Sequence, residues 1–383
     1  MMLVAYMDRV DISVAGKAIM ADLHITKTAF GFVLSAFTVG YALLQFPGGW
    51  LADRFGSKPL LVAALLIWSL FTGLTGMAAS FAILIAIRVV FGIGEGIENG
   101  AQFKLIGDHF EPQERSRANG IFLSALAVGP LLATPLAVWL LAAVGWRVMF
   151  WCFAGLGLIV SGLLFALLPS SSGGPAVERS NLRDLRAALK NAPTWMSISA
   201  YLLFNISFWG FIGWIPTYLQ EQRHVSLHDL GFVGSLPFAF GFVGLLTIGQ
   251  LGTGLFASRR SLLVGLCYLL SAVFFFVALK GSSVVVCVGG LSAGAFFLLG
   301  AFGPFWGSIL DLAPAGSRGA FSGVVNFGGQ VGGFLGQIAI GGLADKMKNF
   351  DGAILLMVIA LVLGAVCMFG LGLRPQTTRG QVA

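Results

Sequence analysis

Apolar runs as long as a bilayer-spanning helix follow one another along almost the whole chain. A spanning helix needs about 20 consecutive, mostly apolar residues, because the hydrocarbon core of a bilayer is about 30 Å thick. Of the 383 residues, 57% are hydrophobic and only 10% are charged, whereas soluble domains carry about 25% charged residues. The chain therefore does not have the composition of a water-soluble globule, and we expect an all-α membrane protein.

Charged and turn-forming residues divide the apolar sequence into twelve segments, each about the length of a bilayer crossing. The segments are residues 1–22, 29–51, 59–80, 82–107, 118–142, 148–168, 194–219, 231–256, 261–280, 283–311, 317–342 and 352–373.

Lysine and arginine are unevenly divided between alternate loops. If the N-terminus is cytoplasmic, 13 of the 23 Lys and Arg residues lie in loops and tails on that side, 6 lie on the other side and 4 lie within spans. Cytoplasmic loops of membrane proteins are enriched in Lys and Arg. We therefore expect both termini to be cytoplasmic, in an inner or plasma membrane. The net charge of +7 is then a property of loops beside membrane lipid and does not indicate nucleic-acid binding.

The longest linker, residues 169–193, separates six predicted spans from six. It begins with "PSSSGGP", a flexible composition. Leu182, Leu185 and Leu189 then form an apolar stripe between basic residues, which predicts a short amphipathic helix on the inner membrane surface. The expected organisation is an N-terminal six-helix bundle, a cytoplasmic linker and a C-terminal six-helix bundle, at residues 1–168, 169–193 and 194–383.

The two halves contain similar sequences at similar places. "GFVLS" at 31–35 recurs as "GFVGS" at 231–235, and "LLV" follows the next basic turn at 60–62 and again at 262–264. Two matches at nearly the same offset indicate an internal duplication. Two parallel six-helix halves are the architecture of the major facilitator superfamily, which the chain resembles in this respect.

A local motif strengthens that resemblance. The segment "GGWLADRFGSKP" at 48–59 is similar to the superfamily's signature between helices 2 and 3, with Pro59 in place of a second basic residue. The resemblance implies an inner-gate role, in which a glycine allows close helix approach and Asp53 pairs with a base or a helix end of the other half. The matching residues are Gly49, Asp53, Arg54, Gly56 and Lys58.

Further motifs resemble one family within the superfamily. "AYMDRVDIS", "FGIGEG", "FEPQERSRANG" and "GWRVMFW" are similar to the anion:cation symporter family, which includes proton-coupled sugar-acid transporters and sialin. The resemblance implies two six-helix bundles around a central cavity, with a small organic anion and protons as partners, no cofactor and no required oligomer. Gly129-Pro130 lacks the other glycines of the antiporter motif, which favours symport.

The segment "RVVFGIGEGIENGAQFK" at 88–104 places charge inside an apolar run. A charge at mid-bilayer costs about 2.5–3.5 kcal/mol on insertion scales. At 100° per residue, Arg88, Gly92, Glu95, Asn99 and Gln102 share one helix face, with Glu98 at its edge. We therefore expect this face to line a cavity, with Arg88, Glu98, Asn99 and Gln102 as candidate wall residues.

Glu95 is the candidate for proton coupling in this segment, because the resemblance implies that role for the matching glutamate. The chemistry agrees, since desolvation favours the neutral form of a carboxyl group. The alternative is a structural arrangement of Arg88 with Glu95 that carries no transported proton. Residues seven apart on a helix, however, are too distant for a direct local pair.

Asp8 and Arg9 form a second charged constellation. The resemblance implies that Arg9 holds the substrate carboxylate and that Asp8 takes part in proton coupling. A guanidinium offers a planar fork that fits a carboxylate, and the adjacent Asp8 is expected to neutralise Arg9 when the site is empty. The alternative is a merely polar N-terminus. Only seven residues precede Asp8, about 10 Å of helix, so helix 1 is expected to be truncated or its start to be annotated too late.

Other candidates for the cavity wall rest on helix faces or on matches to the family. Tyr6 lies on the side of Arg9, and Tyr41 shares a face with Gln45. Trp306 and Asn326 match family positions that line the sugar-acid site, and Asn326 shares a face with Gln330. For the aromatic residues, ordinary packing is the alternative. The candidate substrate-binding residues are therefore Arg9, Tyr6, Tyr41, Trp306 and Asn326, with Gln45 and Gln330 as further wall residues.

Two features depart from the sugar-acid pattern. Residues 97–100 read Ile-Glu-Asn-Gly where family members often carry proline and an aromatic, so Glu98 adds a carboxyl group beside the expected anion site. The fifth span lacks the amide that often binds sugar hydroxyls, and Ser124 is its only polar side chain from Ile121 to Ala133. Aromatic or short carboxylates therefore remain open as substrates.

The sequence thus predicts proton-coupled symport of an organic anion, a sugar acid or another carboxylate, by alternating access. An organic-anion uniporter or exchanger, an efflux carrier of the same fold, and a truncated, non-functional copy are the alternatives. A membrane enzyme would need clustered His, Cys or acids, and only His224, His228 and Asp229 approach metal-ligand spacing, in a loop that hydration explains. No nucleotide-binding loop is present in the sequence. We expect neither an enzyme nor a metal site.

Overall fold

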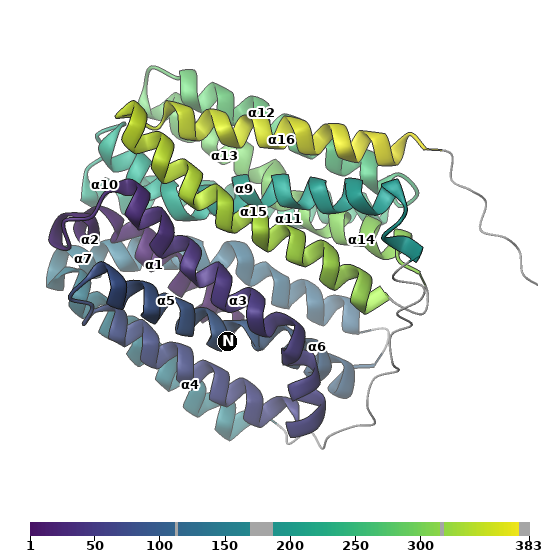
Figure 1. Ribbon diagram of the computed structural model, residues 1–383, viewed down its shortest axis with the longest axis horizontal. Coiled ribbons are helices and arrows are strands. Elements are labelled where there is room, and N and C mark those ends of the chain that lie inside the picture. The colour runs from purple at the N-terminus through teal and green to yellow at the C-terminus, as the bar shows by residue number, and fades with distance from the viewer. Residues whose placement is uncertain (112–113, 169–186, 315–317, 375–383) are drawn as a thin grey trace, which may run out of the picture.

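The described part of the chain, in a computed structural model, is helical throughout apart from its connecting segments (Figure 1). It comprises residues 1–111, 114–168, 187–314 and 318–374. The helices are α1 (Met2–Val14), α2 (Gly16–Asp22), α3 (Lys27–Phe55), α4 (Ser57–Thr75), α5 (Phe81–Gly96), α6 (Glu98–His109), α7 (Arg115–Leu167), α9 (Ala192–Glu221), α10 (Leu227–Val233), α11 (Leu236–Thr253), α12 (Arg260–Lys280), α13 (Val284–Gly300), α14 (Phe302–Leu312), α15 (Arg318–Met347) and α16 (Asp351–Gly372).

Hydroxyl side chains fix several of the helix starts. Thr26 accepts a hydrogen bond from the N–H of Ala29 at the start of α3, and Ser80, Ser226 and Ser283 cap α5, α10 and α13 in the same way. Such caps satisfy backbone donors that have no partner within the helix. Hydroxyl residues in short loops therefore fix the points at which these four helices begin.

Eight helical stretches among the described residues are long and apolar enough to cross a membrane. One of them, Asn119–Leu167, has 49 residues and would be about 74 Å long at 1.5 Å per residue, enough for two crossings. Gly145 breaks this helix with a φ of 78°, a conformation that glycine adopts without strain. The break falls between the predicted spans 118–142 and 148–168.

Three of the twelve predicted segments are not among these eight stretches. They are the ones built from α1 with α2, from α5 with α6, and from α15. All three carry buried charged or amide side chains, such as Arg9, Glu95 and Gln337. Such side chains are rare within spanning helices and usually face the interior of the protein.

The helices form two bundles that meet along a few helix pairs. In the first half α3 packs on α5 and α7 packs on α1 and α4, while in the second half α15 packs on α9 and α12 packs on α13 and α16. Between the halves, α3 packs on α15, α1 on α9, and α7 on α10 and α11. Close backbone contact makes two of these pairs possible. A Cβ atom at Gly31 would lie 2.6 Å from the carbonyl oxygen of Gln337, and one at Gly96 would lie 2.5 Å from that of Tyr41.

Polar contacts join the halves at the end of the molecule where α3 begins and α9 and α15 end. Asp345, in the last turn of α15, accepts hydrogen bonds from the backbone N–H groups of Lys27 (3.2 Å) and Thr28 (2.7 Å) and from the hydroxyl of Thr28 (2.5 Å). The ammonium of Lys27 lies 3.0 Å from a carboxylate oxygen of Glu221. We call these four residues the latch, and the end of the protein that carries them the latch end.

Arginine side chains donate hydrogen bonds to carbonyl groups at the C-terminal ends of two helices at the latch end. Arg147 donates to the carbonyl groups of Gly76 and Ala78 at the end of α4. In the second half, Arg223 donates to three carbonyl groups at the end of α12, those of residues 278, 279 and 281. These carbonyls have no partner within their own helix, so each arginine satisfies the end of a helix in its own half.

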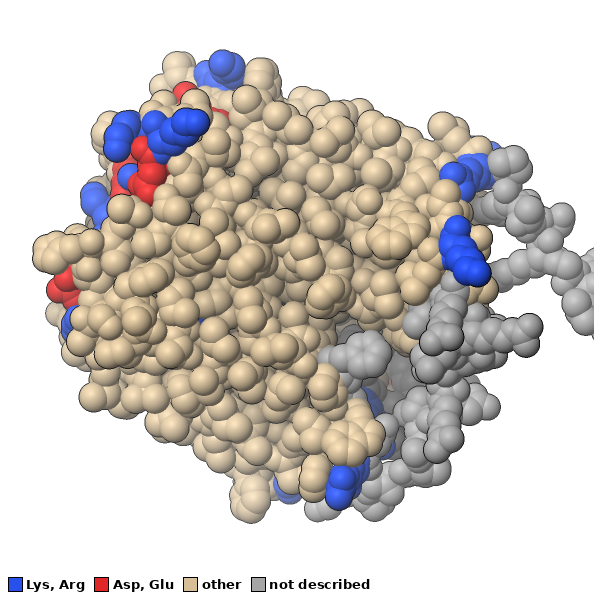
Figure 2. Space-filling model, viewed as in Figure 1, with Lys and Arg blue, Asp and Glu red and all other residues tan. Residues whose placement is uncertain are grey.

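The surface has the distribution of charge expected beside lipid. Figure 2 shows that on this face the blue and red side chains gather at the two ends of the molecule, with an uncharged surface between them. Large apolar side chains such as Trp139, Phe165 and Val285 are exposed. A broad apolar belt of this kind suits the hydrocarbon core of a bilayer.

The predicted inner-gate segment forms the turn between α3 and α4, at the opposite end from the latch. Gly56 has a φ of 83°, Arg54 is exposed, and Lys58 donates a 2.7 Å hydrogen bond to the carbonyl of Leu168. Gly49 lies within α3, and the side chain of Asp53 lies outside the described residues. Residues 169–186 do so too, so the amphipathic helix and the boundaries of the two bundles stay predictions.

Candidate functional site

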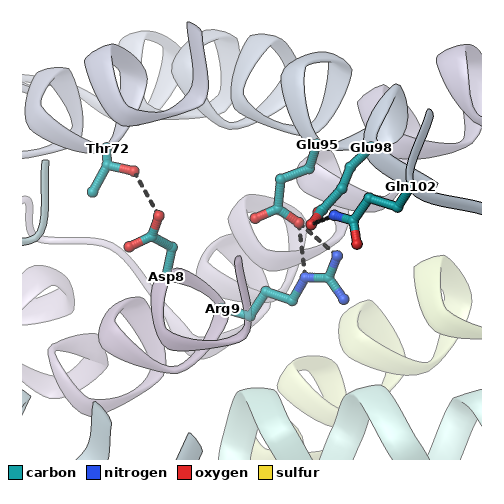
Figure 3. A network of polar contacts seen from close by, with 6 residues as sticks. All are labelled: Asp8, Arg9, Thr72, Glu95, Glu98 and Gln102. Atoms are coloured by element: carbon teal, nitrogen blue, oxygen red, sulfur yellow. Dashed lines mark hydrogen bonds and ion pairs between the residues drawn. The ribbon is translucent and has the colours of Figure 1, made fainter. Parts of the chain in front are cut away.

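A buried ion pair lies at the centre of the first half (Figure 3). Arg9 of α1 donates from Nε (2.8 Å) and from Nη2 (2.6 Å) to Oε2 of Glu95 on α5. Arg9 is 6% exposed and Glu95 is fully buried. The two residues that the sequence assigns to substrate binding and to proton coupling are therefore direct partners.

The geometry of this pair leaves part of each group available. Both donors of Arg9 converge on one oxygen, Oε2, and the second oxygen of Glu95 has no hydrogen-bond partner. A guanidinium has five N–H donors and a carboxylate can accept on both oxygens. The pair is thus not the fully matched, two-by-two arrangement that gives the most stable structural salt bridges.

Aromatic rings surround the guanidinium of Arg9. Its Cζ lies 4.3 Å from the centre of the Tyr6 ring, 5.2 Å from Tyr41, 5.3 Å from Phe37 and 5.6 Å from Trp209. Ring faces attract cations, and more strongly when water is excluded. Tyr6 lies on the side of Arg9, as expected, and Tyr41 of α3 lies beside the same guanidinium. Their roles in substrate binding stay predictions.

Asp8 does not neutralise Arg9, contrary to the expectation from their adjacency. Consecutive residues on a helix point about 100° apart, and Asp8 faces α4, where the hydroxyl of Thr72 lies 3.4 Å from one carboxylate oxygen. The other oxygen of Asp8 has no partner. Glu95, 86 residues further along the chain, is the counter-ion of Arg9.

The guanidinium of Arg88 lies against aromatic rings and does not form the structural pair with Glu95. Its guanidinium lies 4.5 Å from the Phe91 ring centre and 5.4 Å from that of Phe37, and its buried Nε has no hydrogen-bond partner. Asp11 is fully buried, and neither of its carboxylate oxygens has a partner. Asp11 is one of four acids that lie within the spans away from their ends, all in the first half, and an acid in an apolar segment is a signal for a role in transport.

Ile97, between α5 and α6, keeps a helical backbone with φ −72° and ψ −28°. The segment from Arg88 to Gln102 therefore follows a nearly continuous helical path. Glu98, expected only at the edge of the stripe, is buried and accepts a hydrogen bond from the amide of Gln102. The side chain of Asn99 lies outside the described residues.

The second half contributes aromatic and amide groups. Tyr201 of α9 stacks on Phe305 with ring centres 4.7 Å apart, and Trp306 of α14 meets it edge-on at 5.2 Å. On α15 the amide of Gln330 donates to that of Asn326 at 3.3 Å. Trp306, Asn326 and Gln45 of α3 are half-buried.

Sequence reasoning missed Phe37 of α3 and Trp209 of α9, whose rings lie beside the guanidinium of Arg9. It also missed two buried residues of α9, Tyr201 and Asn205, whose amide donates to the carbonyl of Tyr201. A signal was available for α9, because Asn205 is the one amide between Thr194 and Leu219 and a polar residue within a span usually faces the protein interior.

A small cavity with room for about one water molecule adjoins the ion pair. It is lined by side chains from both halves, among them Arg9, Phe37, Arg88, Trp209 and Gln337. Close by, the hydroxyl of Ser13 donates to the carbonyl of Gly213 across the halves at 2.8 Å. Charged groups of the first half and polar groups of the second half thus meet at one central place.

The fold and this centre define a class of protein. Spanning helices in two bundles enclose buried ionisable groups, which is the arrangement of secondary transporters. A protein of this class is integral to the membrane and crosses it several times.

Comparison with known proteins identifies the family. The sequence model of the Major Facilitator Superfamily matches residues 1–337, and the chain belongs to this superfamily. It is 30% identical to the probable galactarate/D-glucarate transporter GudP of Escherichia coli strain K12, over 91% of this chain and 86% of that protein. It is 31% identical to the probable sulfoacetate transporter SauU of Cupriavidus necator, over 99% of this chain and 92% of that protein.

A solved structure shows the same fold. A bacterial homologue of the human lysosomal transporter Spinster, in an inward-facing and unoccupied conformation, superposes with a TM-score of 0.83. The match covers 97% of this chain and 94% of that chain, at 19% identity. The expected fold, two six-helix bundles of the major facilitator type, is confirmed, and the chain is a multi-pass membrane transporter.

Proposed function

We propose that this protein is a proton-coupled symporter of an organic anion, a sugar acid or another carboxylate, that works by alternating access. The observation that carries the proposal is the buried hydrogen-bonded pair of Arg9 and Glu95. Arg9 is the residue proposed to bind the substrate carboxylate, and Glu95 is the one proposed to carry the proton.

The pair links the two functions because its members compete. The substrate carboxylate and the carboxylate of Glu95 need the same donors on Arg9. A proton on Glu95 removes its charge and weakens its hold on Arg9, and the guanidinium then binds the substrate. When the anion leaves and Glu95 loses its proton, the internal pair forms again. Proton and anion therefore bind interdependently.

The balance of buried charge supports proton binding in this region. Asp8, Asp11, Glu95 and Glu98 are all buried, against Arg9 and Arg88. Four acids and two arginines, all ionised, would leave two uncompensated negative charges in a medium that solvates charge poorly, at a cost of several kcal/mol each. Protons on some of these carboxyls would remove that cost, and we assign Asp8 to the same proton pathway.

The relatives support an anionic substrate. Two of them are described as probable transporters of galactarate and D-glucarate and of sulfoacetate, which are all carboxylates. Tyr6 and Tyr41 beside Arg9, with Trp306 and Asn326 from the second half, form the proposed remainder of the binding site. The positive-inside pattern supports cytoplasmic termini, so the latch end is proposed to face the other side of the membrane.

The membrane potential can supply energy to the coupled transport. Each elementary charge that crosses 100 mV is worth about 2.3 kcal/mol. An anion that enters with at least one more proton than its own charge therefore moves with the potential and can be concentrated.

The test is uptake of radiolabelled organic acids into proteoliposomes, with and without an inward proton gradient. We expect accumulation only with the gradient. Glu95→Gln should abolish gradient-driven accumulation and keep counterflow exchange, because the neutral amide resembles the protonated carboxyl. Asp311→Asn, at a partly exposed ion pair with Arg260 at the opposite end from the latch, is the matched control and should keep both activities.

Each of the contrary outcomes would overturn a different part of the proposal. Uptake that ignores the gradient would replace symport by uniport or exchange. Survival of gradient-driven accumulation in the Glu95→Gln variant would remove Glu95 from coupling. Uptake of none of the acids by the folded wild type would overturn the substrate class.

A further inference from the structure

Asp11 of α1 is a fully buried acid that takes no part in the pair of Arg9 and Glu95. Neither of its carboxylate oxygens has a hydrogen-bond partner. Asp8 lies about one helical turn earlier, and one of its oxygens also has no partner, while the other lies 3.4 Å from the hydroxyl of Thr72 (Figure 3). Because a buried carboxylate oxygen without a donor is costly, three such oxygens on two neighbouring side chains favour a proton on one of them.

The charges around the two aspartates do not balance. Asp8 and Asp11 are three residues apart, a spacing that brings side chains together on one helix face, so their carboxylates repel each other. Arg88 of α5 is the positive charge that acts on both, and Glu95 acts on both as a further negative charge. In the other helices that contact α1 here, α2, α4, α7 and α9, the charged residues lie near helix ends or beside the break at Gly145, and they are Lys17, Asp22, Lys58, Arg115, Arg117, Arg147 and Glu221.

One proton would balance these charges. Since Glu95 is the counter-ion of Arg9, only Arg88 is left to compensate the two aspartates. If both were ionised, one negative charge would stay uncompensated in the protein interior. A proton on either carboxyl removes that charge and also supplies a donor for the other carboxylate. Two carboxyl groups that interact this closely share the proton and titrate as one unit.

The aspartates lie toward the latch end from the pair of Arg9 and Glu95. Helix α1 runs toward that end, so Asp11 lies about 3 Å further in that direction than Arg9, at 1.5 Å per residue. Helix α5 begins at the latch end, so Arg88 lies about 10 Å nearer that end than Glu95. A proton that enters from the latch end therefore reaches Asp11 before it reaches Glu95.

We propose that Asp11 shares one proton with Asp8 and that the two aspartates pass protons to Glu95 from the latch end. The inference rests on the proposed function, because it needs Glu95 as the coupling residue. The proton leaves one of the two aspartates and is bound by Glu95 as the substrate carboxylate takes its place on Arg9. Arg88 then stabilises the ionised aspartates until the next proton enters.

Infrared spectroscopy of the purified full-length protein, at neutral pH and without substrate, tests the shared proton. A protonated carboxyl group has a C=O stretching band that an ionised carboxylate lacks. Asp8→Asn and Asp11→Asn should each remove one band of the same intensity, because the carboxylate that remains is balanced by Arg88 and stays ionised. The double variant should remove no more than either single variant. Asp311→Asn, at a partly exposed ion pair, is the control and should remove no such band.

Transport into proteoliposomes gives a second readout, with D-glucarate and sulfoacetate as probes. Asp11→Asn should slow gradient-driven uptake at least tenfold, because a positioned proton-transfer group contributes about 10²–10⁴-fold. Counterflow exchange should stay at the wild-type rate, since exchange needs no net movement of protons. Asp11→Glu keeps the carboxyl group and should restore part of the gradient-driven uptake.

The two readouts separate this inference from the proposed function. A band that is lost in Asp8→Asn and kept in Asp11→Asn would overturn the shared proton, and so would a band kept in both. Wild-type gradient-driven uptake by Asp11→Asn, or an equal loss of uptake and exchange, would overturn its role in loading Glu95. Failure of the folded wild type to couple uptake to the gradient would overturn the proposed function and the loading of Glu95, while the infrared result would still decide whether the two aspartates share a proton.

Discussion

Removing the charge of Asp345 should open the latch end of the protein. The carboxylate lies in the last turn of α15, where the negative end of that helix's own dipole disfavours it. The first N–H groups of α3, on Lys27 and Thr28, stabilise it from the other half. Asp345→Asn keeps the size of the side chain and removes the charge.

The structure sets the size of the effect. Asp345 accepts three hydrogen bonds, at 3.2, 2.7 and 2.5 Å, and hydrogen bonds to a charged group contribute about 1.5–3 kcal/mol each. Asparagine keeps one acceptor oxygen, and Asp345 is only half-buried, so water screens part of the interaction. We expect a net loss of about 1–2 kcal/mol, which is a five- to thirtyfold shift toward the state with the latch open.

The assay is the rate at which a thiol reagent labels a cysteine beneath the latch. Leu34 of α3 is buried and contacts Gly213 of α9, so a Leu34→Cys reporter is protected while the halves are closed there. In detergent solution, where both ends are accessible, Asp345→Asn should raise its labelling rate about tenfold. The same variant without the reporter corrects for the native cysteines.

The pH dependence gives a second readout of the same contact. Partial burial raises the pKa of Asp345, but the hydrogen bonds from Thr28, Thr26 and Lys27 outweigh it, and the net pKa is below the ordinary value of 3.8. A lowered aspartate pKa contributes stability that is present above the ordinary value and lost as pH falls through the lowered one. The ratio of the reporter's labelling rate in the Asp345→Asn variant to that in the wild type should therefore not change between pH 8 and about pH 5. The ratio is used because the thiolate fraction of the reporter falls with pH in both proteins.

The reasoning is refuted if the folded Asp345→Asn protein labels at the wild-type rate. Asp345→Glu keeps the charge and should label more slowly than the asparagine variant. Asp311→Asn removes an acid from an ion pair within the second half and should leave the rate unchanged. An equal increase in that control would mean that any lost charge loosens the protein.

Two further predictions concern stability, measured as the midpoint of thermal unfolding in detergent. Gly96→Val should destabilise the protein by more than 3 kcal/mol, because even a Cβ atom there would lie 2.5 Å from the carbonyl oxygen of Tyr41; an unchanged midpoint would contradict the close approach of α3 and α5. Arg223→Met should cost about 1–3 kcal/mol, because the half-buried guanidinium is the donor to three carbonyl groups at the end of α12, and a midpoint equal to that of the wild type would show that water replaces it.

Much of the fold could be predicted from the sequence, because lipid permits few solutions. Backbone polar groups must be satisfied within each segment, so long apolar runs become helices. Prediction from the sequence was less complete for the polar segments of the helices. Asp8 faces Thr72 of α4, and the partner of Arg9 is Glu95 of α5. Both contacts depend on how the helices pack, which periodicity does not resolve.

The latch shows a signal that is clear only after the structure is known. The first half contains "GGWLADR" at 48–54, and α15 ends with the similar "GGLADK" at 341–346. The known motif drew attention to the first of these, while the second contains Asp345, whose carboxylate binds the start of α3 in the other half. A short motif identifies a helix end whose carboxylate can accept hydrogen bonds. The donors that bind it depend on which helix end the fold places opposite.

The sequence by itself determined the membrane class, the positions of the spans, the family and the identities of Arg9, Glu95, Tyr6 and Tyr41 as central residues. These follow from local properties, since the cost of placing a charge in lipid is the same wherever the chain then goes. Only the tertiary structure decided that Glu95, not Asp8, is the partner of Arg9. It also brought Arg88, Trp209 and Gln337 from three helices to one small cavity. Such pairings depend on how helices rotate and cross, which is set by the packing of the whole bundle and is written in no single segment.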